Sequence, residues 1–419
     1  MNSHLIYERR AVEALRAGVP NRDVVRQLPP VDTEVDKRFQ SLLKNTIEGW
    51  EQSNQASGIL VAGDFGTGKS HYLESFRHQA LEEHFICSSI VLNKETPLYD
   101  PLKIYRACVE SATAPDKLGT ALDELTLTYS SQTAPHYREL FEWVHVNKDL
   151  DPRIAATLSL FERVQNEDLR QKIIAEWMGY PMKVGEIKAA LRDIGEAKTY
   201  QITRSQPGQV LQRFEFLSRF FRSAGYSGWV LLIDETEMIS KYSLLQRAKA
   251  YAQLAKLLGI VKGTNLPGIA SVFTITNDYA GQVLHGRKND RTNIPARLQG
   301  TKNEEFSVAA DMGMKTIETR TAKLSPPTQS QMLDVYQKVR RIYSSAYSWE
   351  APEIEDRREY SASTGMRQYI RSWINTWDLR RLYNYTAENI VEDLPMRYEE
   401  DTDFQAEHPV DDDEPMITF

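Results

Sequence analysis

The sequence predicts an α/β fold, with a three-layer core around a parallel sheet, a long helical insertion and a small all-helical lid domain after the core. Two observations support this prediction. Up to residue 324, short apolar runs alternate with helical patterns, and only helical patterns follow. The first apolar run, GILVA, leads directly into GDFGTGKS, which has the spacing of a phosphate-binding loop (P-loop) between a strand and a helix.

The N-terminal part, residues 1–55, predicts helices that lead into this core. The stretch ERRAVEALR has helical spacing and is followed by Gly18 and Pro20, which commonly end helices. From Val35 to Trp50 the apolar residues again recur at helical spacing.

The core is expected over residues 56–324. Its further strands are predicted from the runs HFICSSIVL, WVLLIDETE and GIASVFTITND, and from the stretch near Lys315 to Leu324. Between the first two of these runs, residues 109–206 show mostly helical patterning. This stretch is predicted to be a helical insertion between the phosphate loop and the next strand.

The C-terminal part is predicted to hold the helical lid at 325–390 and an acidic tail at 391–419. The helical patterns begin with SPPTQSQMLDVYQKVRRIY. From residue 391 to residue 415 there are eleven acidic residues and one basic residue, Arg397. Such a stretch is expected to be disordered and solvated, the alternative being a segment that docks on a partner.

Composition narrows the class of protein. The net charge is −7, and outside the acidic stretch 50 basic and 47 acidic residues remain, so the charge gives no clear sign of nucleic-acid binding. The two cysteines, Cys87 and Cys108, lack metal-binding spacing and are expected to be buried. The sequence shows neither a signal-peptide pattern nor a run of roughly 20 apolar residues. A cytoplasmic protein without a membrane partner is therefore expected.

The phosphate loop supplies the first candidate site residues. Glycines let backbone N–H groups turn towards phosphate oxygens, and the N-terminus of the following helix adds a partial positive charge. Lys69 is expected to reach the β- and γ-phosphates, and the Ser70 hydroxyl to ligate Mg²⁺. The candidate nucleotide-binding residues are Gly63, Asp64, Phe65, Gly66, Thr67, Gly68, Lys69, Ser70 and His71.

The run VLLIDETE supplies the second set of candidate site residues. It places Asp234 and Glu235 at the end of an apolar strand. Asp234 is predicted to help hold Mg²⁺, directly or through water, and Glu235 to polarise the attacking water as a general base. The adjacent acid favours ATP hydrolysis over a GTPase or a small-molecule kinase. Glu237 is a further candidate, the alternative being an ordinary charge at a helix start.

Asn277 and Arg367 are candidates for contact with the γ-phosphate. Asn277 ends the strand ASVFTITND, where its amide can orient the attacking water, although Asn followed by Asp is also typical of turns. Arg367 follows Gly365 at the start of a lid helix and can fold back onto the nucleotide of its own chain. Arg371, one turn later, is expected to pair with an acid or to face solvent.

Arginines in GRKNDRTNIPARLQG are candidates to complete the site of a neighbouring subunit. An arginine that crosses a subunit boundary can stabilise charge in the transition state. Arg297 is the first candidate and Arg291 the second, with Arg287 also considered. The alternatives are a solvated basic loop or one that touches DNA phosphates.

The phosphate loop, the Asp-Glu strand, the polar strand end, the loop arginines and the lid sequence GMR together resemble an AAA+ ATPase. Within that class, the initiator clade of origin-recognition-like ATPases is the nearest branch. More narrowly, RRAVEALRAGVPNRDVV with GDFGTGKSHYLESF and LLIDETE resembles the BREX-system ATP-binding proteins of the BrxD type, which are bacterial phage-defence ATPases. The resemblance covers about residues 8–105 and 205–385.

The resemblance implies a Mg²⁺-dependent ATPase that assembles with copies of itself through its nucleotide sites. It also implies a partner defence protein such as a helicase, with duplex DNA as a further candidate, and places Arg22 and Val24 beside the adenine. Two features depart from the pattern. The phosphate loop and Asp234 lie about 160 residues apart, which requires the insertion. The acidic tail also takes the place of the winged-helix domain usual in initiators, so autonomous DNA recognition is not expected.

Two other functions stay open. The chain can be an ATP-binding switch or scaffold with negligible turnover, if no arginine from a neighbour reaches the γ-phosphate. It can also be a DNA-binding recruiter, for which salt-dependent binding to plain duplex DNA would be the sign.

Overall fold

A computed structural model describes most of the chain. The predicted acidic tail at 391–419 lies outside the described residues, as do Phe65, Arg22 and residues 386–390 of the predicted lid. The described residues are 3–17, 24, 28, 33–64, 66–130, 132–196, 199–203, 209–301, 304–325, 327–354 and 366–385.

In the described part of the chain, five strands form one parallel sheet in the order β2-β3-β4-β1-β5. This confirms the predicted α/β class with a parallel sheet. Because β4 lies between β1 and β3, the carboxyl ends of these three strands meet at one edge, where open α/β sheets bind their ligands. The strands are β1 (Ile59–Ala62), β2 (Ile86–Val91), β3 (Trp229–Asp234), β4 (Ile269–Ile275) and β5 (Ala322–Lys323).

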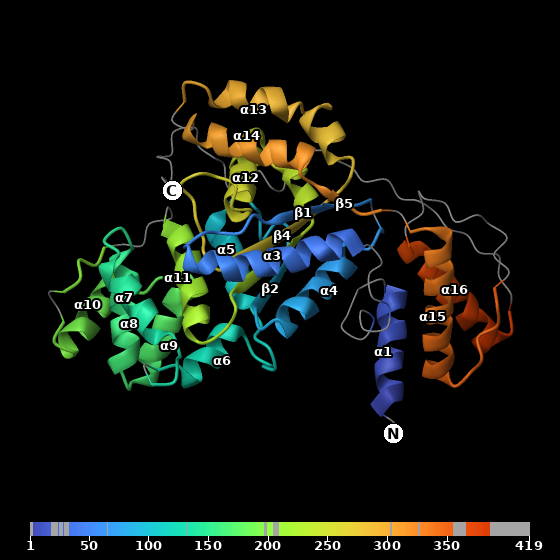
Figure 1. Cartoon of the computed structure of the whole chain (residues 1–419), viewed down its shortest axis with the longest axis horizontal. Helices are drawn as coiled ribbons and strands as arrows, with labels where there is room; N and C mark the ends of the chain where they lie inside the picture. The colour runs from blue at the N-terminus through green and yellow to red at the C-terminus, as the bar shows by residue number, and fades with distance from the viewer. Residues whose placement is uncertain are drawn as a thin grey trace.

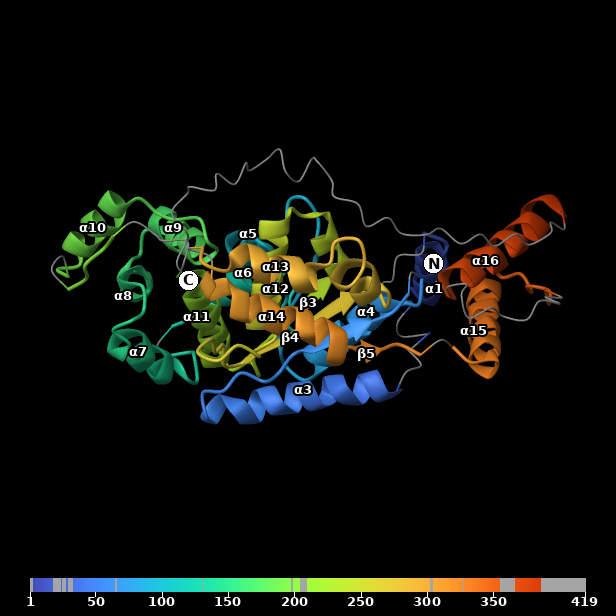
Figure 2. The same cartoon turned by 90° about the horizontal axis from the view of Figure 1, so that it is seen from above.

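Helices cover both faces of the sheet, so the core has three layers. Along β3, Val230 and Leu232 face one helical layer, whereas Leu231 and Ile233 face the other, as the period of two in a strand requires. Figures 1 and 2 show α3 along one side of the sheet and α12 to α14 on the other. The first layer is α3 (Thr33–Glu51) and α4 (Lys69–Glu82), and the second includes α5 (Pro101–Glu110), α11 (Val210–Ser223), α12 (Leu244–Leu257), α13 (Asp290–Leu298) and α14 (Glu304–Thr319).

The strand predicted near Lys315 to Leu324 is wrong over most of its length. Helix α14 continues to Thr319, and β5 comprises Ala322 and Lys323. The β-branched residues in KTIETRT favour a strand, but Ala310, Met314 and Ile317 are buried at helical spacing against the core. Tertiary packing at this helical period therefore overrides the local strand preference.

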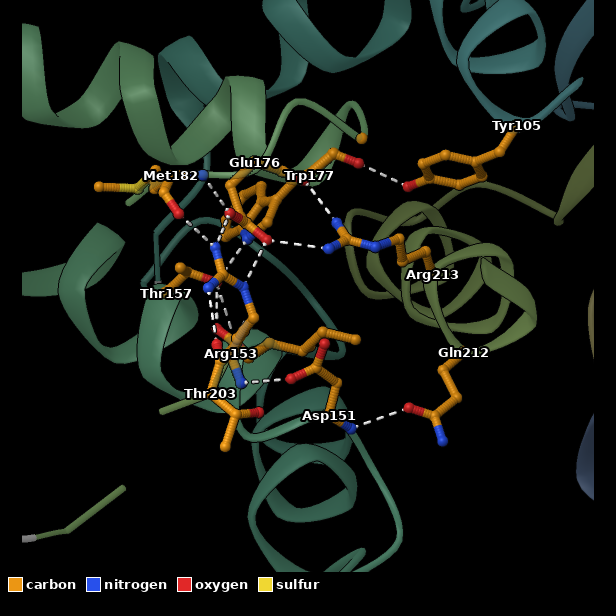
Figure 3. A network of polar contacts seen from close by, with 12 residues as sticks. Tyr105, Asp151, Arg153, Thr157, Glu176, Trp177, Met182, Thr203, Gln212 and Arg213 are labelled. Carbon is orange, nitrogen blue, oxygen red and sulfur yellow. Dashed lines mark hydrogen bonds and ion pairs between the residues drawn. The ribbon is translucent and has the colours of Figure 1, made fainter. Parts of the chain in front are cut away.

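The stretch between β2 and β3 continues beyond α5 as a set of helices. A buried ion-pair network, drawn in Figure 3, ties this set to α11, the helix that leads into β3. Glu176 accepts hydrogen bonds from Arg153 Nε at 3.0 Å and from Arg213 Nη2 at 2.9 Å. The helices are α6 (Ala121–Thr128), α7 (Tyr137–Val146), α8 (Pro152–Arg163), α9 (Glu167–Trp177) and α10 (Val184–Asp193).

All three side chains at the centre of this network are buried, with Arg153 1%, Glu176 2% and Arg213 5% exposed. Burial alone would raise the pKa of Glu176, but the hydrogen bond from Arg153 and the charge of Arg213 lower it below its ordinary value. Removing the single carboxylate would leave two buried guanidinium groups without their anion, which is costly.

The N-terminal helix packs with the C-terminal helices. Residues of α1 (Ser3–Ala17), α15 (Gln329–Tyr347) and α16 (Met366–Tyr383) share one hydrophobic cluster, in which Trp373 and Trp377 are at most 1% exposed. In both views these three helices lie together at one end of the molecule, and α7 to α10 lie at the other. Among the described helices, none has the length and apolar character needed to span a bilayer.

Candidate functional site

The phosphate loop forms a tight turn between β1 and α4. Gly66 and Gly68 have φ angles of 81° and 96°, a region that side chains other than glycine rarely adopt. The backbone N–H of Gly63 donates to the carbonyl of Ile275 at 3.0 Å, and the Thr67 hydroxyl donates to the carbonyl of Asp64 at 2.8 Å. The loop is thus anchored to β4 and closed on itself, and it leads straight into the N-terminus of α4.

Lys69 lies folded against this loop. Its Nζ donates to the Gly63 carbonyl at 2.8 Å and to the Asp64 carbonyl at 3.3 Å, and the residue is 7% exposed. A carboxylate oxygen of Glu237 lies 3.9 Å from the same Nζ. The positive charge therefore lies at the start of α4, where the helix dipole also favours an anion.

Ser70 and Asp234 bring the phosphate loop and β3 together. The Ser70 hydroxyl donates to Asp234 Oδ2 at 2.6 Å, although the two residues are 164 positions apart. Thr274 on β4 donates to Oδ1 of the same carboxylate, and the backbone N–H of Glu235 donates to that oxygen at 3.0 Å. The carboxylate of Asp234 is thereby held in one orientation at the strand edge.

The oxygens of Ser70 and Asp234 fit the ligand preference of Mg²⁺. This ion is commonly held by one or two protein oxygens together with phosphates of the substrate and water. Among the described residues, no group of three or more His, Cys, Asp or Glu side chains is placed to hold a metal ion. The donor set is therefore suited to a nucleotide-borne Mg²⁺ rather than to an ion held by protein ligands alone.

Glu235 follows directly in an unusual backbone conformation. Its φ of 63° is in the left-handed region, which is costly for a residue with a side chain and is concentrated at functional sites. Burial and the neighbouring charge of Asp234 raise the pKa of Glu235, while the positive charges of Lys69 and Arg367 act against this shift. A carboxylate with a raised pKa is a stronger base than a solvated one.

The predicted lid arginine, Arg367, has an electrostatic effect on Glu235. Arg367 lies in the first turn of α16 and is close enough for its charge to act on the carboxylate at the end of β3. Its charge therefore acts on a carboxylate that is distant in the sequence. Arg371 is exposed on the same helix.

Glu237 is more deeply buried than its sequence context suggests. Its side chain is 1% exposed, and its Oε2 is buried without a hydrogen-bond partner. Burial raises the pKa of Glu237 to about 7; the charge of Lys69 opposes the shift and that of Glu235 adds to it. A buried oxygen without a partner beside the phosphate loop marks a place where a polar group of a ligand fits.

Asn277 follows the end of β4, between the other two site strands. Ile275 is in register with Ala62, the last residue of β1, so Asn277 lies just beyond the start of the phosphate loop. Its Oδ1 is buried without a hydrogen-bond partner. This amide is placed at the same edge as Lys69 and Glu235, as the sequence predicted.

Two of the loop arginines, Arg291 and Arg297, lie on α13, and Arg287 lies just before this helix. Arg291 donates to the Asp311 carboxylate, and its Nε lies 3.2 Å from the Glu318 carboxylate. Both acids belong to α14 of the same chain. Arg287 and Arg297 are exposed. The structure thus does not gather these arginines with the site of their own chain.

His71, predicted at the nucleotide, makes a contact within the protein. Its Nε2 lies 2.6 Å from the carbonyl oxygen of Leu28. Burial lowers the pKa of His71, despite opposing effects of the Leu28 carbonyl and the Glu74 charge, so the ring is neutral and its N–H donates to that carbonyl. Leu28 and Val24 belong to the hydrophobic cluster of α1, α15 and α16, which this bond ties to α4.

Thr274 is the site residue that sequence reasoning missed. It occupies a fully buried position of β4, one step beyond the pairing of Ile233 with Phe273. That register sets its hydroxyl opposite Asp234. A threonine within ASVFTITND is indistinguishable from an ordinary strand residue, and only the strand order β3-β4 could have identified it.

Comparison with known proteins adds one match. The chain matches the family model described as BREX system ATP-binding protein BrxC/D over residues 8–372. Neither the search of curated proteins nor the search of solved structures gave a match. The match spans the phosphate loop, Asp234, Asn277 and Arg367, and it confirms the expected relationship to BREX ATP-binding proteins.

Proposed function

Because the chain belongs to the BrxC/D family of BREX system ATP-binding proteins, we propose that it is a Mg²⁺-dependent ATPase of the AAA+ class. The observation that carries this proposal is the 2.6 Å hydrogen bond between Ser70 and Asp234. It joins the phosphate loop to the end of β3, and the next residue is a buried carboxylate with a raised pKa, Glu235. The initiator clade and the BrxD type are the narrower assignments that we propose within this class and family.

Each residue at the strand edge has a role in this proposal. The N-terminus of α4 and Lys69 bind the phosphates, and Ser70 and Asp234 hold Mg²⁺. When bound, Mg²⁺ supplies positive charge that offsets the charge on the phosphate oxygens. Glu235 accepts the proton of the attacking water, and the Asn277 amide orients that water.

Two arginines are proposed to complete the site. Arg367 contacts the γ-phosphate from the lid of the same chain, which its electrostatic effect on Glu235 supports. Arg297, exposed on α13, reaches the site of a neighbouring copy, with Arg291 as the second candidate. The chain would then oligomerise through its nucleotide sites and use ATP to act on a partner in anti-phage defence, such as a helicase bound to duplex DNA.

A specific observation favours a second candidate function, an ATP-binding switch or scaffold with negligible turnover. Arg291 is engaged by Asp311 and Glu318 of its own chain. If Arg291 is the residue that must reach a neighbour, those two contacts have to break first. A chain in which they persist would bind ATP and hold it. The third candidate, a DNA-binding recruiter, has no comparable support among the contacts of the described residues.

Two variants and one control test the proposal. Lys69→Ala should lose binding of a fluorescent ATP analogue because it removes the phosphate-binding charge. Glu235→Gln should still bind ATP, but its turnover should fall by roughly 10²-fold or more if Glu235 is the base. Glu48→Gln, on the exposed face of α3 with 62% of its side chain accessible, should match the wild-type chain in both assays. Normal turnover by Glu235→Gln would show that the base lies elsewhere.

A further inference from the structure

A buried polar network joins α12 and the segment after β4 to the start of α13. Asp290 opens α13 and accepts hydrogen bonds from Arg247 Nε at 2.8 and 3.0 Å and from Arg247 Nη2 at 2.8 Å. The Tyr251 hydroxyl lies 2.9 Å from Asp290 Oδ2 and 2.8 Å from the Tyr279 hydroxyl. Arg247 is 3% exposed and the other three residues are 0% exposed.

The hydrogen bonds in this network have a fixed direction. A carboxylate paired with an arginine only accepts, so the Tyr251 hydroxyl must donate to Asp290. The oxygen of Tyr251 then accepts from the Tyr279 hydroxyl. Burial raises the pKa of both tyrosines well above the ordinary value, so both hydroxyls keep their protons. Loss of any one group therefore removes at least one hydrogen bond from a buried partner.

Both ends of the network lie close in sequence to residues of the candidate nucleotide site. Tyr279 is two residues beyond Asn277, the proposed γ-phosphate contact. On the other side, Arg247 Nη1 donates to the carbonyl of Tyr242 at 2.7 Å. Tyr242 closes the short 3₁₀ helix η2 (Thr236–Lys241), which begins directly after Glu235. Asp290 is thus linked through this network to the two segments that follow the proposed base and the proposed water-orienting amide.

The backbone between Asn277 and Asp290 is tightly constrained. It contains the π-helical turn η3 (Ala280–Leu284), a conformation that is rare and frequent at functional sites. At Gly286 a Cβ atom would lie 2.2 Å from the Gln282 carbonyl oxygen, and Asn289 has a left-handed φ of 45°. Such a segment transmits a displacement at one end to the other better than a loose loop does.

We propose that Tyr279, Tyr251, Asp290 and Arg247 are positioning residues that couple the γ-phosphate contact at Asn277 to the position of α13. The inference rests on the proposed nucleotide site and goes beyond it. Helix α13 is the surface whose arrangement then differs between the ATP and ADP states. Arg297 and Arg291 lie on this helix, and the contacts of Arg291 with α14 hold one of the two arrangements.

Tyr279→Phe tests this coupling because it removes one hydroxyl and leaves the ring in place. Its matched control is Tyr105→Phe, which also removes a hydroxyl from a fully buried tyrosine. That hydroxyl donates to the Trp177 carbonyl at 2.5 Å, next to the ion-pair network of Figure 3. Tyr251→Phe is a second test variant, should Tyr279→Phe fold poorly. All variants are made in the full-length chain.

The readout is amide hydrogen exchange of α13 in the presence of ADP and of a slowly hydrolysed ATP analogue. In the wild-type chain and in Tyr105→Phe, protection of α13 should differ between the two nucleotides. In Tyr279→Phe the difference should disappear, while both nucleotides still protect the start of α4. Where turnover is measurable, kcat should fall at least roughly tenfold at an unchanged KM, because the ATP-bound ground state is retained.

Three outcomes would overturn the inference. These are an unchanged α13 response in both Tyr279→Phe and Tyr251→Phe, an equal loss of response in Tyr105→Phe, and a wild-type α13 that does not distinguish the nucleotides. Failure of the proposed function looks different. If neither nucleotide protects α4 from exchange, both the proposed nucleotide binding and the proposed coupling are refuted. If α13 responds but ATP is not turned over, the coupling stands and only hydrolysis is refuted.

Discussion

Replacing Glu237 by glutamine should stabilise the nucleotide-free protein above neutral pH. The side chain of Glu237 is 1% exposed and faces Lys69, with the carboxylates of Glu235 and Asp234 nearby. Burial raises its pKa to about 7 from an ordinary value of 4.5. Ionisation is thus less favourable in the folded chain than in the unfolded one. Glutamine has the same shape and no charge to lose.

The size of the effect follows from the shift in pKa. A group whose pKa is raised on folding contributes stability below its unfolded pKa, and this contribution is lost as the pH rises through the folded pKa. A shift from 4.5 to about 7 corresponds to about 3 kcal/mol. At pH 8 the free energy of unfolding of the variant should therefore be about 3 kcal/mol higher than that of the wild-type chain. At pH 5 the difference should be less than about 1 kcal/mol.

Thermal unfolding of both chains between pH 5 and pH 8, without nucleotide, measures this difference. The two melting temperatures should lie close together at pH 5 and separate by several degrees at pH 8. Comparison of the two chains removes the contributions of other groups that titrate in the same range. A variant that melts below the wild-type chain at pH 8, or a gap independent of pH, would refute the argument from burial.

Three further predictions concern other parts of the chain. Glu176→Gln should lower the stability of the fold by about 3–5 kcal/mol, because Arg153 and Arg213 lose their buried anion. The control Glu186→Gln, in an exposed pair with Lys172, should change the melting temperature little, and equal losses would contradict this assignment. Ser70→Ala should raise the Mg²⁺ concentration required for turnover at least roughly tenfold, which a Mg²⁺ titration measures. Arg297→Ala should lose roughly 10³-fold in turnover if it acts on a neighbour, and mixing it with Glu235→Gln should restore activity, since each chain supplies what the other lacks. If the mixture stays inactive, Arg297 does not act across subunits.

Much of the fold could be predicted because most of the strands coincide with short apolar runs in the sequence. The runs ILVA, WVLLID and IASVFTI are strands β1, β3 and β4, buried on both faces as parallel strands are. The expected burial of Cys87 and Cys108 is confirmed as well, at 0% exposure. Where the local signal is mixed, as from Lys315 to Thr319, the packing of α14 decided the conformation, and packing cannot be read from a short window.

The candidate site was predictable in its residue types but not in its long-range contacts. Spacing alone identified Lys69 and Asp234, since glycine turns and strand ends leave clear patterns. The pairing of Arg291 with Asp311 and Glu318 depends on how α13 lies on α14, which no spacing reveals. The burial of Glu237 beside Lys69 and the hydrogen bond from Thr274 to Asp234 are likewise long-range contacts that no spacing reveals.

The packing of α1 against α15 and α16 could not be predicted from the sequence either. The apolar stripe of α1 predicts that one face is covered, but it does not identify the partner. The cluster joins residues more than 300 positions apart, as in the hydrogen bond from Arg9 to the carbonyl of Ala346. His71 binds the carbonyl of Leu28, a residue of the same cluster. Its position in the phosphate-loop motif predicted a contact with the nucleotide and gave no sign of this bond.

The most direct test of the central claim is ATP turnover per chain, measured against protein concentration with and without duplex DNA. The account predicts that specific activity rises with concentration, because an arginine of one copy completes the site of another. A further rise with DNA would support a DNA-associated partner. Activity that stays flat and near zero while ATP still binds would contradict the ATPase assignment and leave the chain as a switch.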